Sequence, residues 1–108
     1  MQPMKAVFHV DEPNKIEHAL RNLHNFLAIV PTAELVLVIN GDAITGFTDP
    51  VLQAAMAQLP TVAFHACHNA MNSHNLSEDD IPAFATIVPA GVVDLAELQS
   101  RGFAYIKP

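Results

Sequence analysis

A chain of 108 residues, 51% of them hydrophobic, is long enough to form one domain around one core, and a second domain is not expected. The formal net charge of −6, with all six histidines neutral, argues against nucleic acid and membrane surfaces as partners, because both would require a basic face. Only 15% of the residues are charged, against roughly 25% in an average soluble domain, so we expect another subunit to cover part of the surface. No apolar run approaches the roughly 18 residues that span a bilayer, and residues 1–5 lack the apolar stretch of a secretory signal, which predicts a cytoplasmic protein.

The first half of the chain predicts two strands separated by a helix. Residues 5–10 form an apolar strand that ends at residues 11–13, where two acids and a proline open a helix. From Ile16 to Leu27 the apolar residues recur at helical spacing. Residues 34–39 are apolar without interruption, which is typical of a strand buried on both faces in a parallel sheet.

The second half continues the alternation. Asp49, a capping residue, and Pro50 predict a helix at residues 51–59. The apolar run 61–66 then leads to Cys67 and to a polar stretch in which Ser77 caps a short helical turn before Pro82. The remaining predicted elements are a strand at 85–88, a tight connection at 89–91, a helix at 92–99 with Gly102 as its left-handed stop, and a strand at 103–106.

Alternating strands and helices along the whole chain predict one α/β domain over residues 1–108, with a parallel sheet covered by helices on both faces. Ligands of such sheets bind beyond the carboxyl ends of the strands, so the residues that leave each strand form the candidate site. These residues are Asp11, Asn40, Gly41, Asp42, Cys67, His68, Asn69 and residues 89–91.

Cys67, the only cysteine, is therefore predicted at the edge where this architecture places its chemistry and where a thiol can meet solvent and ligands. A thiol pKa near 8.5 falls to roughly 3.5–7.5 at a helix N-terminus or beside a cation. A helix beginning within residues 68–75 would supply the helix N-terminus, and His65, His68 or His74 could supply the neighbouring cation. The alternative is that Cys67 is one more small buried hydrophobic residue.

Other kinds of site are less well supported. Imidazole and thiolate suit zinc or copper, but the spacing of His65 and His68 is not helical and a second cysteine is lacking. No glycine-rich phosphate loop or nucleophile elbow is present. We expect no metal and no organic cofactor. His9 is predicted to be a core or interface histidine, and His18 and His24 to face solvent.

The order and spacing of several short segments resemble the DsrE/DsrF-like family. These segments are KAVFHV at 5–10, the Asn40-Gly41 strand exit, ACHNAM at 66–71, IVPAGV at 87–92 and LQSRGFAYIKP at 98–108. The resemblance implies a three-layer α/β/α fold with a five-stranded parallel sheet, assembled into homo-trimers or hexamers. It also implies sulfur relay, in which a cysteine after the third strand carries sulfur as a persulfide to or from a partner protein, and Cys67 matches that position.

Two functions follow as hypotheses. In the first, the protein is a sulfur carrier or sulfurtransferase subunit in which Cys67 takes up the sulfur and His65, His68 or Asn69 stabilises the charge. In the second, it is a non-enzymatic binding or assembly protein whose strand-end cleft holds a small ligand or a partner segment, and Cys67 only packs.

Overall fold

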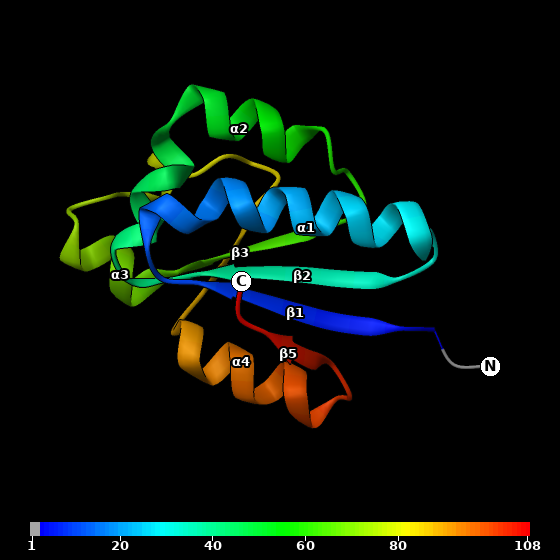
Figure 1. Ribbon diagram of the computed structural model, residues 1–108. Helices are drawn as coiled ribbons and strands as arrows, with labels where there is room; N and C mark the ends of the chain where they lie inside the picture. The colour runs from blue at the N-terminus through cyan, green and yellow to red at the C-terminus, as the bar shows by residue number, and fades with distance from the viewer. Residues whose placement is uncertain (1–2) are drawn as a thin grey trace.

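A five-stranded sheet with the order β4-β3-β2-β1-β5 forms the middle layer of the molecule (Figure 1). Every neighbouring pair of strands is parallel, as predicted. The computed structural model describes residues 3–108; Met1 and Gln2, part of the segment in which no secretory signal was expected, lie outside the described residues. The strands are β1 (Lys5–Val10), β2 (Glu34–Ile39), β3 (Ala63–Cys67), β4 (Thr86–Val88) and β5 (Ala104–Ile106).

Helices cover both faces of the sheet and give the predicted three layers (Figure 1). One face is covered by α1 (Ile16–Ile29) and α2 (Pro50–Ala57), and the opposite face by α4 (Gly91–Ser100). The short helix α3 (His68–Ser73) lies at the carboxyl ends of the strands. Three 3₁₀ helices complete the chain: η1 (Pro13–Lys15), η2 (Gly41–Thr48) and η3 (Glu78–Asp80). Within residues 3–108, no helix has the length and apolar character needed to cross a bilayer.

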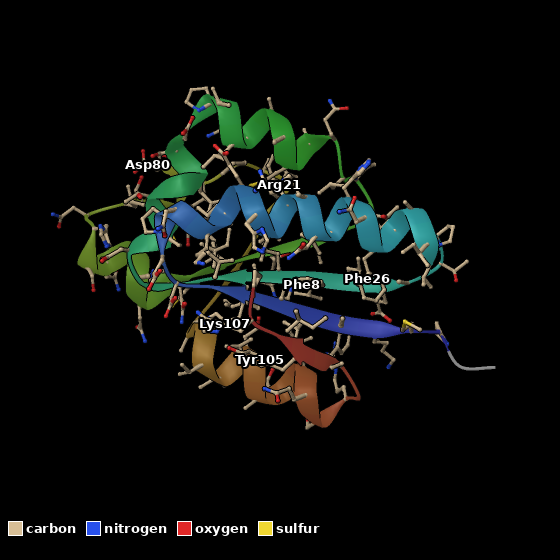
Figure 2. The ribbon with its side chains drawn as sticks, viewed as in Figure 1. Phe8, Arg21, Phe26, Asp80, Tyr105 and Lys107 are labelled. Carbon is tan, nitrogen blue, oxygen red and sulfur yellow. The ribbon has the colours of Figure 1, made fainter. Side chains whose placement is uncertain are left out.

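The alternation of side chains along the strands divides the core into two parts. Phe8 and Leu37 point toward α1 and α2, where the ring of Phe8 meets the ring of Phe26 edge to face, with centroids 6.2 Å apart (Figure 2). The neighbouring residues of β1 and β2 point the other way and pack against α4. This smaller cluster consists of Val7, Val36, Val38, Leu95, Leu98 and Phe103.

The helix boundaries follow the predicted signals. The Asp49 carboxylate accepts a hydrogen bond from the Val51 backbone N–H at 2.9 Å and caps α2. The Ser77 backbone N–H donates to the Asp80 carboxylate at 2.8 Å in the turn predicted there. Gly102 has a φ of 93°, as expected of a left-handed stop. β1 and β2 have the predicted bounds, and the ends of the other strands and helices differ from the predicted ones by at most two residues.

The sequence pattern did not reveal η2. We expected residues 40–42 only to stop a strand, but the chain turns at Gly41, with a φ of 54°, into a 3₁₀ segment that runs to Thr48. Three of its side chains, Ala43, Ile44 and Phe47, are completely buried. Burial of these apolar residues therefore orders a segment whose polar start suggested a loop.

Candidate functional site

A pocket of about 350 Å³ lies at the carboxyl edge of the sheet. Its walls come from the exit of β2, the end of β3, helix α3 and the first turn of α4. The lining residues are Asn40, Gly41, Asp42, Cys67, Asn69, Ala70, Ser73, His74, Ala90, Gly91 and Val92. The pocket lies where the parallel topology predicts ligands to bind.

Cys67 is the last residue of β3 and the N-cap of α3. The residue is only 5% exposed, so the expectation of a thiol open to solvent is wrong in that form: the sulfur lies in a buried wall of the pocket. Its Sγ accepts a hydrogen bond from the Gly91 backbone N–H at 3.2 Å. An N–H donor interacts more strongly with an anionic sulfur than with a neutral thiol.

Gly91 allows Asn40 to approach this contact closely. A Cβ atom at Gly91 would lie 3.0 Å from Asn40 Cβ and 3.2 Å from Asn40 Nδ2, so a larger residue would displace the amide. The same amide takes part in a chain of hydrogen bonds, with Asn40 Oδ1 2.8 Å from His9 Nε2 and His9 Nδ1 2.7 Å from the Tyr105 hydroxyl. His9 therefore bridges β5 and the pocket wall.

A polar pair borders the pocket beside Cys67. His74 Nε2 lies 3.0 Å from the Asp42 carboxylate, and the pair joins α3 to η2. The Asp42 side chain is 81% exposed and that of His74 is 29% exposed, so the pair occupies the open rim. His74 thus lies beside the pocket, as one of the histidines that the sequence placed near the thiol.

The other predicted site residues fall into two groups. Asn40, Gly41 and Asn69 line the pocket together with Cys67. His68 lies outside the lining, with its Nδ1 3.5 Å from Asn72 Nδ2.

His65 lies on the same face of β3 as Cys67, as expected, but it does not line the pocket. Its Nδ1 donates to the Asp94 carboxylate at 2.7 Å, and both side chains are largely buried, at 16% and 11% exposure. This pair ties β3 to α4.

Asp11 also lies outside the pocket lining. The Lys107 ammonium donates to its carboxylate at 2.7 Å, and this hydrogen bond holds the pKa of Asp11 below its ordinary value of 3.8. The Asp11 backbone carbonyl accepts from the Ala43 N–H at 3.2 Å. Asp11 therefore supports the turn that carries Gly41 and Asp42.

The sequence pattern missed the pocket residues Ala70, Ser73 and Val92, and it did not assign a role to Tyr105. Tyr105 pairs with Val7 in the sheet, and the alternation of β1 then places it on the same face as His9. That signal was present in the sequence, but it required knowledge of the strand order. No group of three or more potential metal ligands gathers anywhere in the described part of the chain, residues 3–108.

Comparison with known proteins agrees with the fold. The model of the DsrE/DsrF-like family matches residues 5–108. A solved structure titled as a protein of unknown function, MTH1491 from Methanobacterium thermoautotrophicum, superposes with a TM-score of 0.89 at 24% identity and covers 97% of this chain and 99% of that chain. The ychN protein from E. coli superposes with a TM-score of 0.79 at 15% identity, and both chains are covered completely. The curated protein sequences contain no match.

Proposed function

Because the chain belongs to the DsrE/DsrF-like family, we propose that it is a sulfur-relay protein in which Cys67 carries sulfane sulfur as a persulfide to or from a partner. The observation that carries this proposal is the hydrogen bond of 3.2 Å from the Gly91 backbone N–H to Cys67 Sγ in the wall of the pocket. A purely packed cysteine requires no such donor, whereas a thiolate nucleophile is stabilised by one.

The transfer step conserves charge and needs no external oxidant. The Cys67 thiolate attacks the outer sulfur of a donor persulfide, R–S–SH, and the donor S–S bond breaks as the new S–S bond forms. The products are Cys67–S–SH and the thiolate R–S⁻, so the electron pair of the broken bond leaves with the donor. Delivery of the sulfur to an acceptor thiolate is the same exchange in the opposite direction.

The pocket suits a small or protruding donor. Its volume of about 350 Å³ falls within the roughly 300–1,000 Å³ of ligand pockets. Gly91, Asn40 and Asn69 line the pocket together with the thiol and offer backbone and amide groups to a ligand. At the rim the carboxylate of Asp42 repels anions, although its pairing with His74 reduces this effect. A persulfide on a partner protein is therefore a better donor than a free anion.

Self-association is part of the proposal. The side chains Val92 and Val93, at the start of α4, are 67% and 55% exposed although they are apolar. Val92 also lines the pocket, so a second copy that covered this apolar pair would narrow the access to Cys67. We expect light scattering to give the mass of a trimer or hexamer, and a mass equal to one chain would contradict the assembly.

Mass spectrometry tests the sulfur-carrier proposal directly. After incubation with a persulfide donor and removal of excess reagent, the intact protein should gain the mass of one sulfur atom. Since Cys67 is the only cysteine, Cys67→Ser is a complete control and should gain none. An unmodified wild type under conditions that load a reference thiol would refute the proposal.

The burial of Cys67 favours a second candidate, a binding or assembly protein in which the thiol only packs. In that case, Cys67 of the native assembly should resist alkylation at every pH below unfolding, and Cys67→Ala should leave ligand or partner binding intact. Rapid alkylation of the folded protein would exclude this candidate.

A further inference from the structure

A hydrogen-bonded chain crosses the sheet from its exposed edge to the pocket wall. It begins at the Tyr105 hydroxyl on β5, a residue that is 43% exposed, on the face of the sheet that α4 covers (Figure 2). It passes through the half-buried ring of His9 on β1 and ends on the side chain of Asn40, just beyond β2.

The strand register brings the end of this chain beside Cys67. Ile39 of β2 is paired with Ala66 of β3, so the next residues along the two strands, Asn40 and Cys67, are neighbours on one face of the sheet. Adjacent strands lie about 4.8 Å apart. The amide of Asn40 also lies against Gly91, the residue whose N–H holds the sulfur.

The direction of the hydrogen bonds determines which end of the amide faces the pocket. Asn40 Oδ1 can only accept, so His9 Nε2 carries a proton and donates to it. Nδ1 of the neutral ring then accepts from the Tyr105 hydroxyl. The Asn40 NH₂ group is thereby left for the other side, where Nδ2 lies 3.2 Å from the position that a Cβ atom would take at Gly91, a residue that lines the pocket with Asn40 and Cys67.

We propose that Tyr105 and His9 are positioning residues that hold the Asn40 amide with its N–H donors toward the pocket, where they stabilise negative charge on the sulfur of Cys67. This role rests on the proposed function, because the charge that the Asn40 amide stabilises is that of the attacking thiolate or of the outer sulfur of the persulfide. Tyr105 and His9 act only through Asn40, and this dependence makes the proposal testable.

The test is a double-mutant cycle on the reactivity of the thiol. The rate of alkylation of Cys67 by iodoacetamide is measured against pH in the wild type, Tyr105→Phe, Asn40→Ala and the double variant. Tyr105→Phe removes one exposed hydroxyl and keeps the ring, so it should fold, and a thermal melt of each variant verifies this. Asp42 and His74, the titratable groups on the pocket rim, are the same in all four proteins.

Loss of the amide N–H dipole beside the charged sulfur should move the midpoint of the pH–rate curve upward by up to about one pH unit in Asn40→Ala. Tyr105→Phe should move it upward by about half as much, and the double variant should match Asn40→Ala. A change that only altered access to the thiol would multiply the alkylation rate by the same factor at every pH and leave the midpoint of the curve unchanged. Because Tyr105→Phe keeps the aromatic ring beside His9 and removes only the hydroxyl, it separates the effect of the hydrogen bond from that of packing.

Two results would overturn the proposal. In the first, the midpoint of the pH–rate curve in Tyr105→Phe equals that of the wild type. In the second, Tyr105→Phe raises the midpoint by the same amount in the wild type and in Asn40→Ala. Alkylation does not require sulfur uptake. The failure of sulfur transfer would therefore appear as an unloaded wild type in mass spectrometry, while the failure of the positioning role would appear only in the cycle.

Discussion

The two faces of the central sheet are built from different chemistry although they share the same strands. Between the sheet and α1 with α2, the buried residues are apolar, with Phe8 and Leu37 at the centre. On the α4 face, the strands carry His9, His65 and Cys67 among their valines, and each of these three side chains forms a hydrogen bond. The first face supplies stability through apolar burial, whereas the second gives up part of that burial to position polar groups around a pocket.

The largest difference between the faces should appear in their tolerance of cavities. Leu37→Ala on the α1 and α2 side removes a completely buried side chain and should cost about 2–5 kcal/mol of the free energy of unfolding. Leu98→Ala on the α4 side, also almost completely buried, should lie near the lower end of that range because α4 alone can move toward the sheet. Urea denaturation measures both values.

Equal losses in the two leucine variants would show that the α4 layer is as rigid as the opposite one. The two faces of the sheet would then differ in polarity alone and not in packing.

Two glycines test the same contrast at close range. At Gly46, a Cβ atom would clash with Cδ1 of the buried Ile16, so Gly46→Ala should cost about 1–3 kcal/mol through overpacking and leave the thiol unaffected. At Gly91, the added methyl group meets Asn40, so Gly91→Ala should slow the alkylation of Cys67 several-fold with a smaller loss of stability. Thermal melts and alkylation rates of the two variants provide matched readouts.

The opposite pattern, with a reactive thiol in Gly91→Ala and a slow one in Gly46→Ala, would contradict the assignment of function to the α4 face.

The buried pair of His65 and Asp94 is expected to anchor α4 to the sheet. Asp94→Ala leaves the His65 N–H without its partner in a largely buried position, which should cost about 1–3 kcal/mol of unfolding free energy. Glu97→Ala, an exposed change on the same helix, is the control and should stay within about 0.5 kcal/mol of the wild type. If the two variants are equally stable in urea denaturation, the pair does not hold the helix.

The sequence predicted the apolar face better than the polar one, and the physical reason lies in the range of the interactions. Period, capping residues and turn residues are local signals, so the helix at Ile16, the Asp49 cap and the Gly102 stop followed from them. The alternation of strands and helices and the family resemblance likewise led to a parallel sheet with a cysteine at its carboxyl edge.

The contacts of the site are not local. Cys67 meets Gly91 across 24 residues, and His9 meets Tyr105 across 96. Neither contact has a spacing rule in the sequence, so His65, His68 and Asp11 were as eligible for the pocket as Asn40 and Asn69 were. The burial of Cys67 also depends on how α4 docks, which no pattern around the residue encodes.

The smallest effect is expected at the pair of Asp11 and Lys107, which joins the end of β1 to the C-terminal segment beside the α4 face. The ammonium lowers the pKa of the Asp11 carboxyl, so the folded protein holds its proton less tightly than the unfolded chain does. The pair therefore stabilises the fold above the unfolded pKa of about 4, and this contribution disappears as the pH falls through the lower folded value. Because the two side chains are 45% and 49% exposed, solvent screening limits it to at most about 1 kcal/mol.

Lys107→Met should therefore raise the pKa of Asp11 toward 3.8 in a titration followed by NMR of its carboxyl group. It should also lower stability slightly at neutral pH and converge with the wild type in acid. A stability difference that persisted below the folded pKa would come from packing of the lysine stem and not from the charge pair. Since Asp11 also holds the Gly41 turn through its carbonyl, an unchanged alkylation rate of Cys67 in Lys107→Met would show that this ion pair supports the edge of the polar face without tuning the thiol.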